Sequence, residues 1–172
     1  ADGFDGTWVA HPDLVPLARE VFSTALGGKP NQVAIRKRED VDVSPNDLIN
    51  FHIPGGQITE HGFRQNISIA LRYLESWLNG VGAAAIDNLM EDTATAEISR
   101  AQLWQWIHNA NAVLDNGTKI NAQLYNKWRD EEYNKLPPSS KLEKAKVVLD
   151  MLVLGNMFPE FLTIIAYDRL DN

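Results

Sequence analysis

The sequence predicts a mainly α-helical protein, a bundle of about five helices preceded by one strand and one helix. From residue 59 onward the apolar residues recur at intervals of three and four, which is the spacing of a helix face that packs into a core. Turn residues such as Gly80 and Asn116-Gly117 interrupt this periodicity and separate successive helices. Residues 3–10 differ from this pattern, because they are short, aromatic and β-branched, as in a strand.

Residues 1–28 are expected to form a strand followed directly by a helix. The strand is predicted over residues 3–10, and Pro12 falls in the first turn of the helix, where proline is favoured. Gly27-Gly28 is a typical helix end. A strand that runs straight into a helix is half of a β-α-β unit, yet no partner strand follows. We therefore expect the rest of this sheet in a longer protein, upstream of residue 1.

The next segment, residues 29–58, is predicted to be a surface linker. It contains a charged stretch that begins at Arg36 and a Pro54-Gly55-Gly56 turn. Ser44-Pro45 is a typical start for a short helix within it. The linker marks the boundary between the first part of the chain and a C-terminal helical domain over residues 59–172.

The helical domain is expected to contain two long helices and three shorter ones. Thr59 is positioned to cap the first of them, and the apolar residues from Phe63 to Leu78 follow helical spacing. Pro137-Pro138 separates two of the later helices, and Pro159 is expected to open the last one. The predicted helices span residues 59–78, 93–114, 121–135, 140–155 and 159–167.

Composition and charge exclude several classes of protein. The chain has 172 residues, of which 44% are hydrophobic, enough for a folded core. Its net charge of −7 repels phosphate backbones, so we expect no nucleic acid among its partners. The apolar runs are too short to span a membrane, and the absence of cysteine excludes disulfides. Because Leu170-Asp171-Asn172 is not a Ser-Lys-Leu peroxisomal address, we expect a cytoplasmic protein.

Asp92 is the residue with the clearest chemical interest. It follows Met90-Glu91 at the predicted start of the helix over residues 93–114. An aspartate in this position commonly caps a helix by accepting hydrogen bonds from backbone N–H groups two or three residues on. It can also serve as a general base, because a helix N-terminus favours an ionised carboxylate. The residues alone favour the cap and leave the base open.

Four blocks of the sequence are similar to the C-terminal part of malate synthases of the isoform A type. They occur in that family's order, and the last of them is long and specific. The blocks are Asp5-Gly-Thr-Trp-Val-Ala-His-Pro12, Ile58-Thr-Glu60 with Arg64-Gln-Asn-Ile67, Tyr73-Leu-Glu-Ser-Trp77 and the run from Leu89 to Ile107.

The resemblance implies a fold and a reaction. The family combines a TIM barrel with a C-terminal helical plug, so residues 1–28 correspond to the last strand and helix of a truncated barrel and residues 59–172 to the plug. The implied reaction condenses acetyl-CoA with glyoxylate and hydrolyses malyl-CoA to malate and CoA. The implied catalytic base is Asp92, which takes a proton from the acetyl methyl group. The resulting enolate needs electrostatic stabilisation by fixed donors.

The resemblance also implies which residues surround the substrates. Trp8 and Pro12 correspond to the family's pocket for the adenine of CoA, and Met90 is expected near the acetyl group. The implied cofactor is Mg²⁺, which polarises glyoxylate as a Lewis acid. The family's acidic magnesium ligands and catalytic arginine have no counterpart in this sequence, and we expect them upstream of residue 1. The chain alone is therefore expected to be inactive.

Two functions remain in competition. The first is the C-terminal domain of a malate synthase, with Asp92 as the catalytic base. The second is a non-catalytic helical interaction module that retains the fold. Asp92 in its full sequence context favours the enzyme, because a module without catalysis would not need the acid there.

Overall fold

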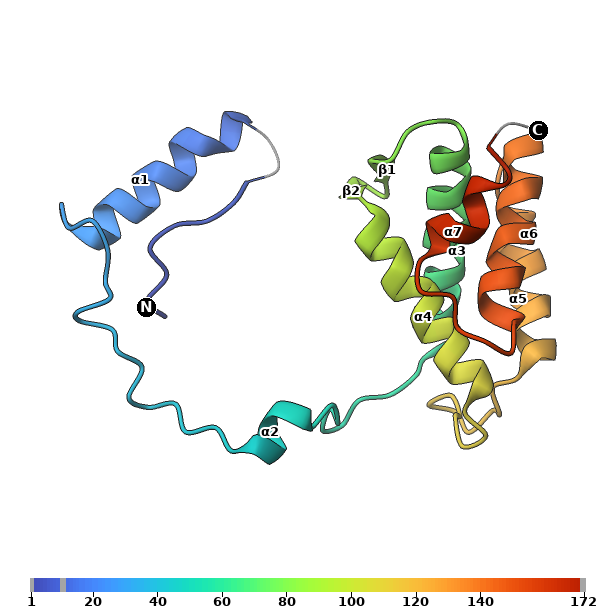
Figure 1. Cartoon of the computed structure of the whole chain (residues 1–172), viewed down its shortest axis with the longest axis horizontal. Coiled ribbons are helices and arrows are strands. Elements are labelled where there is room, and N and C mark those ends of the chain that lie inside the picture. Colours follow the sequence, from blue (N-terminus) through green and yellow to red (C-terminus); the bar gives the residue numbers. More distant parts are fainter. Residues whose placement is uncertain (1, 10–11, 171–172) are drawn as a thin grey trace. The chain divides into compact units, whose positions relative to one another are not determined.

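The structure is a computed structural model that describes residues 2–9 and 12–170. The chain divides into two compact units, residues 1–53 and 54–172, which are described separately (Figure 1). The predicted mainly α-helical class is confirmed. Within the described residues, no helix is both long and apolar enough to cross a lipid bilayer.

The first unit contains two helices, at both of the predicted places. A 3₁₀ turn, η1 (Pro12–Leu14), leads into α1 (Val15–Leu26); the start predicted at His11 lies outside the described residues. α1 ends at Gly27, which adopts the left-handed conformation (φ 58°) that glycine allows. The short helix α2 (Pro45–Ile49) starts with a capping box, in which Ser44 and Asp47 each accept a backbone N–H from the other.

The strand predicted over residues 3–10 is wrong for its described part, because residues 2–9 form no strand. A strand needs neighbouring strands to satisfy its backbone groups, and the first unit offers none among its described residues. The segment instead bonds to the loop after α1. Gln32 donates its backbone N–H to Asp5 Oδ1 (2.7 Å) and its side-chain amide to the carbonyl of Phe4 (2.8 Å).

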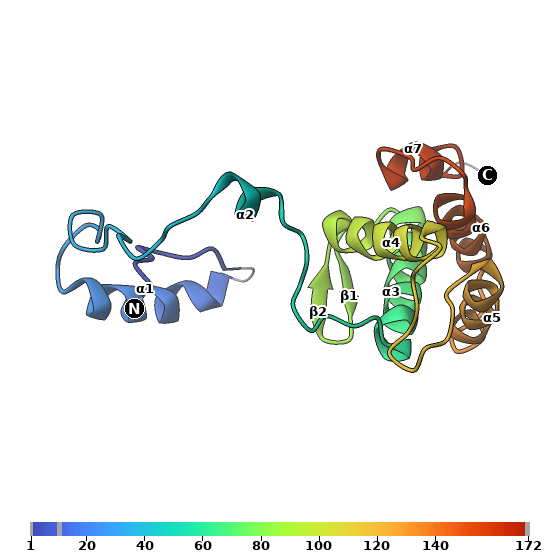
Figure 2. The same cartoon turned by 90° about the horizontal axis from the view of Figure 1, so that it is seen from below.

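The second unit is a helical bundle with one small β-hairpin. α3 is its central helix and packs against β1, α4, α5 and α6, so that it lies between the hairpin and the α5–α6 pair (Figure 2). The elements are α3 (Glu60–Leu78), β1 (Ala84–Ile86), β2 (Leu89–Glu91), α4 (Thr93–His108), α5 (Ala122–Tyr133), α6 (Ser140–Leu154) and α7 (Leu162–Tyr167).

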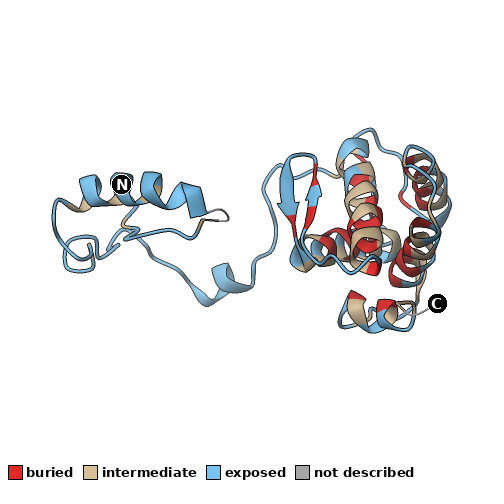
Figure 3. Cartoon of the chain, turned by 90° about the horizontal axis from the view of Figure 1, so that it is seen from above, coloured by how far each residue is buried: buried red, intermediate tan, exposed pale blue. Residues whose placement is uncertain are grey.

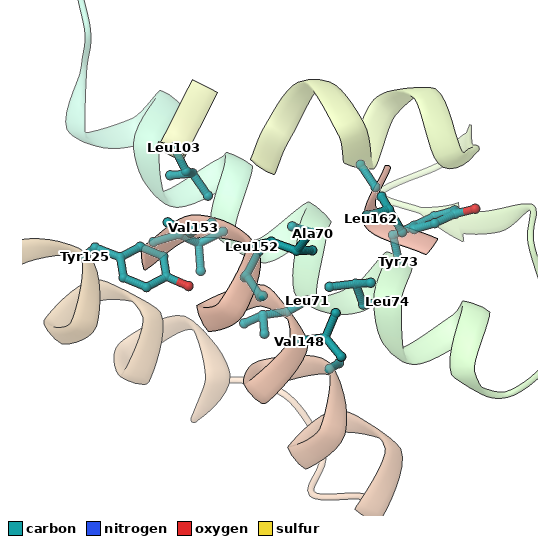
Figure 4. Packing of buried hydrophobic residues seen from close by; sticks show 14 of the residues in the cluster. Ala70, Leu71, Tyr73, Leu74, Leu103, Tyr125, Val148, Leu152, Val153 and Leu162 are labelled. Carbon is teal, nitrogen blue, oxygen red and sulfur yellow. The ribbon is translucent and has the colours of Figure 1, made fainter. Parts of the chain in front are cut away.

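The core of this unit is an apolar cluster to which every long helix contributes (Figure 3). Leu71 and Leu74 of α3 point toward Val148 and Leu152 of α6, and all four side chains are buried (Figure 4). Burial of one such side chain stabilises the fold by about 1.5 to 3 kcal/mol. The apolar spacing in the sequence therefore identified the face of α3 that packs into the core.

α4 ends at His108 instead of continuing to the predicted end near Leu114. Asn109 has an extended backbone (ψ 110°), and residues 112–120 form a tight loop in which Ile120 donates its N–H to the carbonyl of Ala112 (3.1 Å). Leu114 also forms a bridge with Ile58, next to the start of α3. These contacts satisfy backbone groups that a longer helix would have paired internally.

α7 begins at Leu162 and not at the predicted Pro159. Its N-cap residue, Phe161, has no side chain that can accept a hydrogen bond. Glu97 of α4 takes this role from across the fold, because its Oε1 accepts the N–H of Leu162 at 2.6 Å. A carboxylate at a helix N-terminus is favourable, so this tertiary contact decides where α7 starts.

A polar network joins α5 to α6. Burial raises the pKa of Tyr125 well above its ordinary value, so its hydroxyl stays protonated and donates to Asp150 Oδ1 at 2.9 Å. Arg129 pairs with the other oxygen of Asp150 and with Asp130. Lys146 of α6 donates to Asp130 at 2.6 Å and lowers the pKa of that carboxyl. Because its members pair with one another, the network is compatible with a half-buried interface.

The Leu152→Ala variant is expected to lose about 2 to 5 kcal/mol of unfolding free energy, because it leaves a cavity between α3 and α6. Leu152 is 0% exposed, whereas Val147 on the same helix is 43% exposed. Val147→Ala is therefore the matched control and should change stability by less than about 0.5 kcal/mol. Urea unfolding followed by circular dichroism measures both; equal losses would contradict the assigned core.

The pair Lys146–Asp130 should make stability depend on pH. The pKa of Asp130 is lowered in the folded state, so the pair stabilises the fold above the ordinary aspartate pKa and is lost as the pH falls through the folded value. Lys146→Met should remove this part of the decline below about pH 4. The effect should be at most about 1 kcal/mol, because the Asp130 side chain is 49% exposed.

Lys144→Met is the control for that measurement, since Lys144 lies on the same helix and has no ion pair among the described residues. Urea unfolding at a series of pH values between 3 and 7 compares the three proteins. If Lys146→Met and Lys144→Met follow the same curve, the pair does not contribute to acid sensitivity.

Candidate active site

The segment between α3 and α4 is a tight β-hairpin, which the sequence did not lead us to expect. β1 and β2 pair antiparallel, with Ala84 opposite Glu91. The turn residues Asp87 and Asn88 both have positive φ, 51° and 64°. Such a two-residue turn matches the twist of the two strands, and aspartate and asparagine tolerate it better than most residues do. The hairpin therefore delivers β2 directly to the start of α4.

Asp92 lies where β2 ends and α4 begins. Its backbone is extended (φ −117°, ψ −175°), and its Oδ1 accepts hydrogen bonds from the N–H groups of Ala94 (2.9 Å) and Thr95 (3.3 Å). This is the N-cap geometry that the sequence predicts. Oδ2 has no hydrogen bond to any residue in the described part of the chain, and the side chain is exposed. One oxygen thus caps the helix while the other remains free.

The hairpin is attached to the central helix α3 by polar contacts as well as by packing. The Tyr73 hydroxyl lies 3.0 Å from the carbonyl oxygen of Gly82, before β1, and 2.7 Å from Thr93 Oγ1, at the start of α4. Arg72 pairs with Asp87 of the turn at 2.8 Å. These contacts fix both ends of the hairpin and its tip relative to α3.

Met90 and Glu91, the two residues before Asp92, point to opposite faces of the hairpin. Met90 is 66% exposed, so it is available to contact a ligand beside the Asp92 carboxylate. The Glu91 residue is 9% exposed, its backbone pairs with Ala84, and its side chain has no hydrogen bond or ion pair with any residue that the structure describes. The structure thus brings Met90 and Asp92 together at one open site.

Trp8 and Pro12 belong to the first unit, whereas Asp92 belongs to the second. Both are exposed, Trp8 by 84%. A cavity of about 330 Å³ lies between residues 5–9 and α1; Val9 and Phe22 line it, whereas Trp8 and Pro12 do not. An exposed aromatic side chain such as that of Trp8 can stack against a planar ring such as a purine.

No metal centre is found among residues 2–9 and 12–170, because no three histidine, aspartate or glutamate side chains there are grouped closely enough to hold an ion. The donor chemistry of the Asp92 site agrees with this. Its free oxygen is a single potential ligand, whereas Mg²⁺ prefers an octahedral set of oxygens. The described residues therefore do not fit a magnesium ion.

The matches to known families follow the two units of the chain. Residues 57–170 match the family described as malate synthase, C-terminal, and residues 1–51 match the malate synthase TIM barrel domain. The chain belongs to the malate synthase family. The similarity read from the four sequence blocks is therefore confirmed, and Asp92 lies within the matched C-terminal region.

Relatives from bacteria and an animal agree with this assignment. The malate synthase of Myxococcus xanthus is 43% identical over 178 residues, which cover 99% of this chain and 32% of that protein. The bifunctional glyoxylate cycle protein of Caenorhabditis elegans is 46% identical over 98% of this chain and 18% of its own length. Malate synthase A of Escherichia coli is 34% identical over 98% of this chain and 33% of its own length. The chain thus spans about a third or less of these relatives.

Sequence reasoning missed two features of this candidate site, the hairpin and the contacts of Tyr73. The hairpin had a usable signal, because Asp87-Asn88 stands between two short apolar runs and both residues favour positive φ. The Tyr73 contacts had none. Gly82 and Thr93 are nine and twenty residues away from Tyr73, and only the folded hairpin brings them to one hydroxyl.

Proposed function

We propose that this chain forms the C-terminal part of a malate synthase, which condenses acetyl-CoA with glyoxylate and water to give malate and CoA. The observation that carries the proposal is the half-occupied carboxylate of Asp92, at the junction of β2 and α4 within the region that matches the family. The relatives named malate synthase support the reaction.

In this proposal Asp92 is the catalytic base. Its Oδ1 is held by two backbone N–H groups, which fix the orientation of the carboxylate, and Oδ2 is free to accept a proton from the acetyl methyl group. A base must reach its proton at hydrogen-bond distance, and a carboxylate on a rigid helix start meets that requirement. Proton removal yields an enolate whose charge needs fixed donors nearby.

The other site residues have supporting roles in the proposal. Met90, exposed beside Asp92, contacts the acetyl group, and Trp8 and Pro12 contact the adenine of CoA. Mg²⁺ would supply Lewis-acid polarisation of glyoxylate, but the described residues form no site for it, so we place its ligands in the barrel domain outside this chain.

The proposal assigns residues 1–28 to the last strand and helix of the barrel, residues 29–58 to the linker and residues 59–172 to the helical plug. Residues 3–9 form no strand here, and beside the remaining strands of a barrel they would have neighbours to pair with. The predicted cytoplasmic location and the absence of nucleic acid among the partners stay predictions; two relatives, from Candida tropicalis and Glycine max, are named glyoxysomal.

Asp92→Asn in the full-length enzyme should lower kcat by about a hundredfold or more, because the amide cannot accept a proton. Asparagine caps helices as well as aspartate does, so the stability of α4 should be kept. Asp92→Ala is the companion variant, which loses both roles and should also lose about 1 kcal/mol of stability. Malate formation is measured by release of free CoA, and stability by urea unfolding.

Near wild-type turnover by Asp92→Asn would refute the assignment of the base. Wild-type turnover by Asp92→Asn together with a large loss in Asp92→Ala would reduce Asp92 to a structural cap. The pair of variants therefore separates the two roles that the residue combines.

The 172-residue chain alone should form no malate, with or without added Mg²⁺. Its described residues contain no magnesium site, so the Lewis acid that the proposal requires has nothing to hold it. The measurement is CoA release from acetyl-CoA and glyoxylate, with the full-length enzyme as the positive control. Turnover that depends on Mg²⁺ in the isolated chain would overturn the placement of the metal ligands outside it.

A further inference from the structure

We propose that Tyr73 is a positioning residue for Asp92, which it holds in place through Thr93. This inference rests on the proposed function of Asp92 as the base. Tyr73 belongs to the block Tyr73-Leu-Glu-Ser-Trp77, which the catalytic assignment leaves without a role. Its side chain is 0% exposed, and its hydroxyl reaches the two ends of the segment that carries the base.

The hydrogen-bond directions in this contact follow from counting protons. A phenol has one O–H, and the Gly82 carbonyl can only accept, so Tyr73 donates to Gly82 at 3.0 Å. The contact of 2.7 Å with Thr93 must therefore have the threonine hydroxyl as its donor. Each hydroxyl uses its proton in one defined direction, and the chain Thr93 to Tyr73 to Gly82 is fully satisfied.

The contact fixes the carboxylate from its C-terminal side. Thr93 is the first residue of α4 and directly follows Asp92, so anchoring Thr93 restricts the position of the cap. On the N-terminal side, Glu91 is held by its pairing with Ala84. The first turn of a helix is the part that frays, and a hydrogen bond to the core helix α3 opposes this. Asp92 is therefore positioned relative to the bundle core and not only relative to its own helix.

The other polar contacts between α3 and the hairpin do not reach the start of α4. The Ser76 hydroxyl donates to the carbonyl of Val81 at 3.0 Å, which holds the loop before β1 but does not reach α4. Arg72 pairs with Asp87 at the turn, and the Asp87 side chain is 67% exposed, so this pair contributes little. Tyr73 alone among these contacts joins α3 to the residue next to the base.

Tyr73→Phe in the full-length enzyme tests the inference, because it removes the hydroxyl and keeps the ring in the core. We expect kcat to fall about tenfold to a hundredfold, the range for a misplaced catalytic group, with KM for both substrates unchanged. Proton abstraction should become slower relative to the other steps. The isotope effect on kcat with acetyl-CoA deuterated at the methyl group should therefore increase, which a purely structural defect would not cause.

Two matched controls lie in the same domain. Tyr125→Phe removes an equally buried tyrosine hydroxyl, which donates to Asp150 between α5 and α6, and Ser76→Ala removes a neighbouring hydrogen bond of the hairpin loop. Both should lower the unfolding midpoint while leaving kcat and the isotope effect within about twofold of wild type. A kcat for Tyr73→Phe within twofold of that for Tyr125→Phe would overturn the inference.

Thr93 provides an independent variant if Tyr73→Phe folds poorly. Thr93→Val should reproduce the loss in kcat, whereas Thr93→Ser should retain wild-type kcat because it keeps the hydroxyl. The double variant that combines Tyr73→Phe with Thr93→Val should be no slower than either single variant. Equal rates for Thr93→Ser and Thr93→Val would also overturn the inference. If Asp92→Asn is inactive while Tyr73→Phe is normal, only the positioning role fails. If Asp92→Asn is fully active, the proposed function fails first.

Discussion

The arrangement of the second unit depends on the burial of a single helix, α3. Within five consecutive residues it contacts the hairpin, α4, α6 and α7. Tyr73 reaches the hairpin and α4, Glu75 accepts a hydrogen bond from Ser139 at the start of α6, and the Trp77 ring lies 5.8 Å from that of Tyr167 in α7. Since α3 is surrounded on several sides, its own conformation is well determined by packing. Side chains and segments that contact α3 are held in place with it, which is what the proposed role of Asp92 requires.

A second constraint comes from a cation of α4 that is buried against the segment between α6 and α7. Arg100 is 1% exposed, pairs with Glu97 at 2.6 Å, donates to the carbonyl of Glu160 at 3.1 Å and lies over the Phe158 ring at 3.8 Å. A buried charge is tolerated only when such partners compensate for the loss of water. Trp104 adds a hydrogen bond to the carbonyl of Gly155 at 2.8 Å. Together these side chains hold the segment between α6 and α7 against α4, and so fix the helix that Asp92 caps.

Local pattern was enough to place most helices, because their apolar residues recur with helical spacing and their N-caps are chemically distinctive. Thr59, Asn121 and Ser139 each cap the helix that follows them. The same local chemistry predicted the cap at Asp92. Apart from the hairpin, whose turn residues carry a local signal, what escaped depends on partners far away in the chain, such as the acceptor that Glu97 provides for α7. The prediction of a strand over residues 3–10 was wrong for its described part. The composition is that of a strand, but the neighbouring strands are not in the described chain.

The contact between Glu97 and Leu162 also bears on the order in which the protein folds. α7 has six residues, which is too short for a helix to be stable by itself. Its first N–H is satisfied by a side chain 65 residues earlier in the sequence, on the helix that Asp92 starts. We therefore expect α7 to form only once α4 is in place, because closing a loop of this length costs conformational entropy. The start of α7 in this sense reports whether α4 is complete.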